Sequence, residues 1–190
     1  FTLIGATTRA GLLPPPLRDR FGISFRLDFY DVKDLVLIIL RAAKTLGIEI
    51  EEDEAYLIAQ RGRGTPRVAI RLLKRVRDFA QMRTEGILSK DIILSAFSSL
   101  DIDEKGLDEM DRRLLLTLIE KFKGGPVGLD TIATIIGEDK DTVEDVYEPY
   151  LLQISFLERT QRGRVVTKNA YSHLGIKNLG VKRKDSPSLF

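Results

Sequence analysis

Apolar residues recur at helical spacing from residue 31 onward, and capping and turn residues interrupt them at short intervals. One apolar stripe comprises Leu35, Ile38, Ile39 and Ala42. Asp31 precedes this stripe as an N-cap, and Gly47 follows it as a stop. Helices this short bury their apolar stripes only against one another. The sequence therefore predicts a mainly helical fold made of small bundles.

Four helices are expected before residue 101, at 31–46, 52–60, 66–82 and 90–99. Together they predict a small bundle or lid, and the polar segment 101–106 marks a domain boundary after it. The helices expected next are 108–122, 129–136 and 140–152, followed by β-prone runs at 156–160 and 165–167. A Gly-containing turn separates the two runs, so this order predicts a winged helix-turn-helix.

Residues 1–31 follow a different pattern. Phe1–Ile4 is typical of a buried strand, and 24–29 alternates as a second strand would. Pro14–Pro16 argues against a regular helix between them. Because a single buried strand cannot make a sheet, we expect this chain to be the C-terminal part of a longer one. The expected organisation is an α/β remnant at 1–31, a lid at 32–102, a winged-helix domain at 103–180 and a flexible tail at 181–190.

The composition excludes several kinds of site. There is no cysteine and only one histidine, which excludes disulfides and thiolate ligands and argues against His-based metal sites, so no metal site is predicted. The chain lacks a GxxxxGK[ST] phosphate loop, and we expect it to be inactive as a nucleotide hydrolase on its own. The longest apolar run, 35–40, is too short for a bilayer, and no secretory leader opens the chain, so a cytoplasmic location without membrane contact is expected.

Charge is nearly balanced overall but uneven along the chain. Residues 57–83 carry a net +7, 101–154 a net −8 and 155–190 a net +6. Blocks of opposite sign predict separate surfaces with separate partners. Three arginines, at positions 159, 162 and 164, lie on or beside one predicted hairpin tip. This cluster suits contact with a phosphate backbone, although a hairpin that is merely solvated would have the same pattern. The acids of the preceding helix, Asp141, Glu144, Asp145 and Glu148, would repel phosphate.

Other arginines and two threonines are candidates for phosphate chemistry. Arg18 and Arg20 follow a proline turn, where a guanidinium can stabilise a phosphoryl-transfer transition state or simply pair with Asp19. Arg67 stands at a helix start, which favours an anion, although it also continues a solvated face. Thr7-Thr8 ends the first predicted strand, where a hydroxyl can orient a water or merely close a turn.

Taken in order, the segments 3–11, 17–22 and 63–67 closely resemble the RuvB family, the bacterial Holliday junction branch-migration motors of the AAA+ class. The segment 156–164 is similar to the DNA-binding wing of that family. The resemblance covers nearly the whole chain. It implies the end of an α/β AAA+ core without its Walker A and Walker B elements, then the four-helix AAA+ lid, then a winged-helix domain.

The resemblance also implies roles for individual residues. Thr7 or Thr8, with Thr8 favoured, matches the sensor-1 position that reads the γ-phosphate. Arg20, with Arg18 nearby, matches the arginine finger that reaches the ATP of a neighbouring subunit. Tyr30 matches a residue beside the nucleotide.

Further roles follow in the lid and the wing. Arg67 matches the sensor-2 arginine, which moves with the lid. Arg159 and Arg164 match DNA-contacting positions, and Arg162 and Lys140 are further candidates for contact with DNA.

The implied cofactor is ATP with Mg²⁺, held mainly by residues upstream of this chain. The implied partners are double-stranded DNA and Holliday junctions, a RuvA-like junction-binding protein, a RuvC-like resolvase and further copies in a hexameric ring. The implied setting is recombination and repair in the bacterial cytoplasm, at the nucleoid.

Two alternatives remain open at this point, and the second of them comes from another class. One is a different AAA+ DNA-remodelling ATPase, a clamp loader or an initiator, because those proteins also have a sensor-2 lid. The other is a non-enzymatic winged-helix regulator in which 103–180 binds DNA and the lid only dimerises. The acidic face of the 140–152 helix weakens the second alternative, since it offers no base-reading set.

Overall fold

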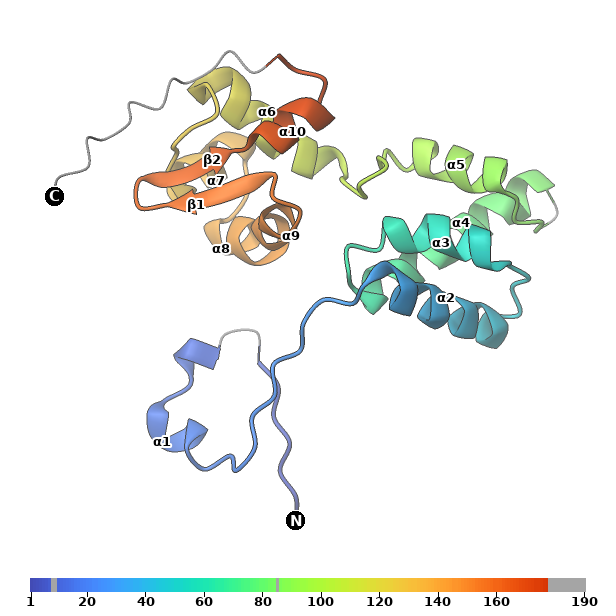
Figure 1. Cartoon of the computed structure of the whole chain (residues 1–190), viewed down its shortest axis with the longest axis horizontal. Coiled ribbons are helices and arrows are strands. Elements are labelled where there is room, and N and C mark those ends of the chain that lie inside the picture. Colours follow the sequence, from blue (N-terminus) through green and yellow to red (C-terminus); the bar gives the residue numbers. More distant parts are fainter. Residues whose placement is uncertain (8–9, 85, 178–190) are drawn as a thin grey trace, which may run out of the picture.

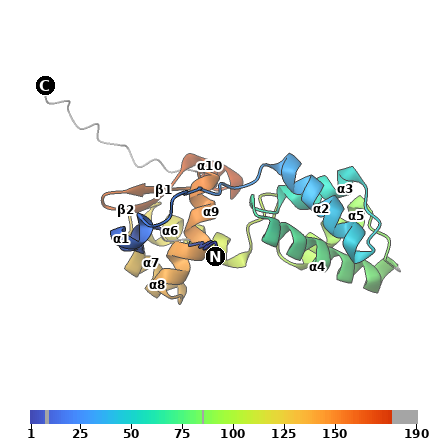
Figure 2. The ribbon, with the colours of Figure 1, turned by 90° about the horizontal axis from the view of Figure 1, so that it is seen from below.

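The computed structural model describes residues 1–7, 10–84 and 86–177. Two helical units account for most of this chain (Figure 1). The first contains α2 (Val32–Leu46), α3 (Glu52–Gln60), α4 (Pro66–Thr84) and α5 (Lys90–Ser99). The second contains α6 (Glu109–Phe122), α7 (Leu129–Ile136), α8 (Lys140–Thr142), α9 (Glu148–Gln153), β1 (Leu157–Thr160), β2 (Gly163–Val166) and α10 (Lys168–His173). Figure 2 shows the two units side by side.

The first unit is a four-helix bundle with a core of its own. Leu35, Ile39 and Ala43 on α2 pack with Ile58 on α3 and Leu73 on α4, all fully or nearly fully buried. The Asp31 side chain caps α2 by accepting from the Asp34 amide at 2.9 Å, and Gly47 ends the helix in the left-handed region. The bundle predicted for this part of the sequence is confirmed by these helices.

The second unit has the layout of a winged helix. Its separate core centres on Leu115 and Leu118 of α6, Ile132 of α7 and Leu151 of α9. β1 and β2 form an antiparallel pair in which Arg159 lies opposite Arg164. This hairpin lies against α9 and α6 and forms the wing (Figure 1). The predicted three helices followed by a hairpin are therefore confirmed in outline.

The two strands expected near the start of the chain are not found. Residues 1–4 and 24–29 have no strand assignment, and the one sheet among the described residues is the β1–β2 pair. A ladder needs a hydrogen-bonding neighbour, and no other described strand lies beside either run. Consequently Phe25 and Leu27, which the alternation placed on one face of a strand, are 85% and 93% exposed.

Two predicted helical boundaries also need correction. A one-turn helix, α1 (Pro15–Arg18), begins within the triple proline, because a proline at the first helical positions loses no needed hydrogen bond. The helix expected at 140–152 is divided into α8, a π-helical turn, η2 (Val143–Tyr147), and α9. The predicted tail at 181–190 lies outside the described residues.

In the described part of the chain, no helix is long and apolar enough to cross a membrane. His173, the one histidine of the sequence, is mostly buried at the end of α10, where its Nε2 lies 2.7 Å from the Asp103 carboxylate.

The second core gives a stability prediction. Leu118→Ala should lower the free energy of unfolding by about 2–5 kcal/mol, because Leu118 is fully buried and its loss leaves a cavity. Leu116→Ala on the same helix is the matched control, since Leu116 is only partly buried, and about 1 kcal/mol or less is expected. Denaturant unfolding followed by circular dichroism measures both, and equal losses would contradict this packing.

Candidate functional site

The start of α4 brings together two of the residues predicted to contact a nucleotide. The Tyr30 amide donates to the Gly64 carbonyl at 2.8 Å, so the end of the first segment is fixed to the loop before α4. Arg67 is the second residue of α4, and its side chain is exposed. The free amides of a helix start favour an anion, and an arginine placed there adds further donors. Tyr30 and Arg67 thus frame one corner at the edge of the bundle.

The other predicted phosphate-chemistry residues lie on the first segment. Arg18 ends α1 and Arg20 follows two residues later, and both are exposed. In Figure 1, α1 stands apart from α4, so within one chain the structure does not bring these arginines to Arg67. Thr7 is described and has an interaction within the chain. Thr8 lies outside the described residues.

The wing holds two of its arginines on one buried carboxylate. Arg159 Nε lies 2.8 Å from Glu148 Oε1, and its Nη2 lies 3.0 Å from Oε2. Arg164 makes the same two-pronged contact at 2.9 and 3.0 Å. The Glu148 side chain is only 1% exposed. One carboxylate at the start of α9 therefore fixes both strands of the wing.

The four predicted DNA-binding residues differ in how accessible they are. Arg162 is exposed at the hairpin turn, and among the described residues no ion pair holds its side chain. The Arg159 side chain is 50% exposed and that of Arg164 only 16%. Lys140 lies on α8, where its Nζ pairs with Asp130 at 2.8 Å. Arg162 is thus the most available cation of the four, and Arg164 is the least.

The role of Glu148 in the structure differs from the role predicted from the sequence. Its place in an acidic run predicted a side chain that repels phosphate, but it is buried and paired with two arginines. Burial acts to raise its pKa, yet the hydrogen bonds from Arg159 and Arg164 outweigh burial and hold the pKa below its usual value. No local signal in the sequence identifies Glu148, because its partners Arg159 and Arg164 lie 11 and 16 residues away in the chain.

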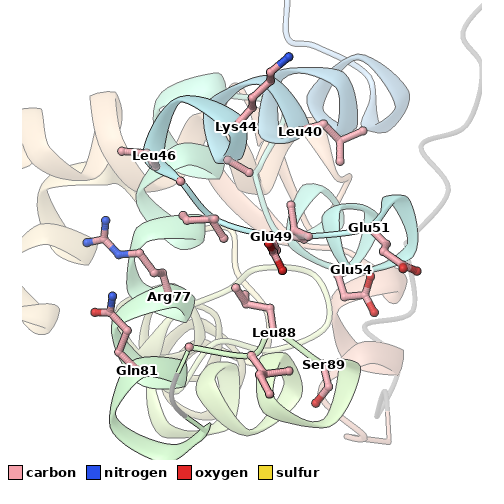
Figure 3. A pocket seen from close by; sticks show the side chains of 16 residues that line it. Leu40, Lys44, Leu46, Glu49, Glu51, Glu54, Arg77, Gln81, Leu88 and Ser89 are labelled. Carbon is pink, nitrogen blue, oxygen red and sulfur yellow. The ribbon is translucent and has the colours of Figure 1, made fainter.

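A hollow between the helices of the first unit lies away from these sites. It has a volume of about 1030 Å³ and is formed by the ends of α2 and α4 and the loops that precede α3 and α5 (Figure 3). Gln81 on α4 lines it, whereas Arg67 lies at the opposite end of that helix. Among the residues placed in the structure, no group of three or more His, Asp or Glu side chains could hold a metal ion.

Comparisons with known proteins bear on all three segments. The RuvB C-terminal winged helix domain matches residues 104–175, the RuvB AAA lid domain matches 30–103, and the P-loop domain of the Holliday junction DNA helicase RuvB matches 1–27. The chain belongs to the RuvB family. The AAA lid and the winged helix expected from the sequence are thereby confirmed.

Solved structures of RuvB proteins give the same result. The Holliday junction branch migration motor RuvB of Thermotoga maritima is 55% identical to this chain, with a TM-score of 0.87 over 91% of this chain and 58% of the Thermotoga chain. A mutant form of the Thermotoga protein matches with 55% identity and a TM-score of 0.86 over the same shares. The chain thus spans somewhat more than half the length of the RuvB proteins it matches.

The contacts of Arg159 and Arg164 with Glu148 predict a pH-dependent contribution to stability. Glu148→Gln should lower the free energy of unfolding by about 2 kcal/mol at pH 7, a discounted value because Arg159 is half exposed. The lowered pKa of Glu148 stabilises the fold above pH 4.5, its ordinary value, and this advantage is lost as pH falls through the folded-state pKa.

The difference between wild type and Glu148→Gln should therefore shrink on acidification from pH 7 to pH 3. Glu144→Gln is the control, because the Glu144 side chain is 37% exposed and lies 3.4 Å from Arg159, and an effect of about 0.5 kcal/mol or less is expected. Chemical denaturation at each pH makes the measurement, and a difference that grows toward acid would refute this assignment.

Proposed function

We propose that this chain is part of an ATP-driven ring motor that translocates double-stranded DNA and so migrates Holliday junctions in recombination and repair. The single observation that carries the proposal is the 55% identity to the Thermotoga branch migration motor along nearly the whole chain, with one fold throughout. The division at residues 31 and 102 belongs to the same proposal: the end of an ATPase core, then a lid, then a DNA-binding domain.

The chain offers residues for ATP from two sides. Arg67 and Tyr30 form a corner that suits the phosphates and the neighbouring part of a nucleotide bound to the same subunit. Arg20, assisted by Arg18, stands on an exposed segment apart from that corner, which suits a finger reaching the nucleotide of the next subunit. Thr8 or Thr7 would orient the attacking water. ATP would supply the phosphoryl group, and Mg²⁺ would neutralise its charge. Both would be held mainly by the parts that precede this segment in complete RuvB proteins.

Supplying the finger from a neighbour would make hydrolysis depend on the ring. Self-assembly into a hexamer, with the ATP of each subunit completed by the next, follows as part of the proposal. Arg67 would tie the angle of the lid to the state of the nucleotide, so that hydrolysis becomes a rigid-body movement. A RuvA-like protein would place the ring on the junction, and a RuvC-like resolvase would act on the product.

The wing supplies the DNA contact in this proposal. Arg162 at the tip and the outer part of Arg159 offer positive charge without a set of side chains for reading bases, which suits a motor that grips phosphates of any sequence. Arg164 and Lys140 stay candidates, Arg164 in a supporting position because Glu148 holds it. Neither a clamp loader or initiator nor a regulatory winged-helix protein is favoured by any feature of the fold.

The finger assignment is tested in the complete protein. Arg20→Ala should leave ATP binding intact and reduce hydrolysis by about 10³-fold or more, because an arginine finger stabilises charge that develops only in the transition state. Arg18→Ala is the matched variant, and the larger loss identifies the finger. ATP turnover and nucleotide binding measured side by side decide the matter, and unchanged turnover in both variants would overturn the assignment.

The wing assignment is tested with this chain and duplex DNA. Arg162→Ala should weaken binding to all sequences alike and reduce the slope of log K against log salt by about 1, because one phosphate contact is lost. Arg83→Ala, an exposed arginine at the far end of α4, should leave both quantities unchanged. Fluorescence anisotropy over a salt series makes the measurement. An equal effect of the two substitutions would show that the wing does not carry the contact.

A further inference from the structure

Arg63 reaches from the loop before α4 into the winged-helix unit. Its Nε donates to the Gly106 carbonyl at 2.7 Å, and its Nη2 pairs with the Asp111 carboxylate of α6. Its guanidinium also lies over the ring of Tyr150 on α9, 5.0 Å from the ring centre. With its side chain only 16% exposed, Arg63 is an anchor between the two units.

The partner of Arg63 is fixed within the second unit. The Asp111 side chain is fully buried, and its Oδ2 also accepts from the Asp108 amide at 3.0 Å in the capping box that starts α6. Burial raises the pKa of Asp111 to about 6, although Arg63 acts to lower it. Withdrawing Arg63 would leave a buried carboxylate without its counter-ion, so any movement of one unit against the other is costly.

The connection between the two units has no slack either. Tyr150 donates its hydroxyl to the Lys105 carbonyl at 2.6 Å, and the Asp103 carboxylate lies 2.7 Å from His173 Nε2 of α10. Arg112 of α6 holds the Asp101 carbonyl at 3.1 Å. At its two ends, Ile102 packs on the lid core and Leu107 is fully buried in the second core. The segment 101–107 is therefore a fixed joint.

The same loop also meets the end of the first segment. Gly64 has a φ of +64°, and a Cβ placed on it would lie 2.8 Å from the Phe29 Cβ and 3.2 Å from the Gln153 side chain of α9. Its carbonyl accepts the Tyr30 amide. Residues 63–64, which lie three to four positions before Arg67, thus contact the end of the first segment and the winged-helix unit at one point.

We propose that Arg63 is a coupling residue that locks the lid and the winged helix into one rigid lever, so that the movement which Arg67 reports passes undiminished to the wing. The joint 101–107 then does not act as the hinge of the motor. The mechanical consequence rests on the proposed function. The lock itself is a property of the chain, and each part has its own experiment.

The lock is tested with the 190-residue chain alone. The wild type should unfold in one transition that includes both cores, and Arg63→Ala should separate it into two. Amide hydrogen exchange at 101–107 should rise in the variant by about tenfold or more, because the joint then opens without global unfolding. Arg83→Ala is the matched control, since Arg83 also stacks on a ring of its own unit, that of Phe79 at 5.6 Å.

A double-mutant cycle identifies the ion pair as the cause. Asp111→Asn should accelerate exchange at 101–107 in the wild-type background and have little further effect when Arg63 is already alanine. Additive effects would overturn the role of the pair. A single transition with unchanged exchange in Arg63→Ala would overturn the lock altogether.

The mechanical part is tested in the complete protein on a four-way junction. The quantity measured is the length of DNA migrated per ATP hydrolysed, which a residue of merely structural importance would not change in the surviving folded enzyme. Arg63→Ala should lower this ratio by about tenfold, and Arg63→Lys, which keeps the charge without the fork, by less. An unchanged ratio would overturn the coupling role while the motor function stands. A wild type that migrates no junction would instead refute the proposed function, and the exchange experiment would still judge the lock.

Discussion

The buried ion pair between Arg63 and Asp111 is the contact on which the arrangement of this chain depends. It joins a loop of one bundle to the first turn of a helix in another, and both partners are held by further bonds on their own side. A charge pair of this kind adds little stability compared with an apolar contact of the same size, but it tolerates very few relative orientations of its partners. The ion pair therefore restricts the relative orientation of the two units strongly, while it adds little to their stability.

The wing shows the same solution in a second place. Glu148 is almost fully buried, and two arginines from different strands share its oxygens. In both places a buried carboxylate at the start of a helix accepts hydrogen bonds from arginines of other elements, whose planar guanidinium groups match its oxygens. Charge in this chain is thus divided between a buried part that sets geometry and an exposed part, such as Arg162, that is available to a partner.

The sequence predicted the helices well because their signals are local. Asp31 and Gly47 mark the ends of α2, and they act through bonds that span only a few residues. Strands at 1–4 and 24–29 could not be judged in this way, since a strand exists only with its neighbours. Within the sites, Arg67 and Arg162 were recognisable from their positions at a helix start and a turn. Glu148 and Arg63 were not, because their partners lie 11 to 48 residues away in the chain.

The exposed face of the first segment has a practical consequence for work with this chain in solution. Phe25, Leu27 and Phe29 present apolar side chains in alternation, with 85%, 93% and 53% of each exposed. Such a run invites strand pairing between copies, and self-association driven by apolar surface strengthens as salt is added. Attraction between the wing and nucleic acid weakens under the same change. Raising the ionic strength therefore distinguishes self-association through the first segment from nucleic-acid binding through the hairpin, because the first strengthens and the second weakens.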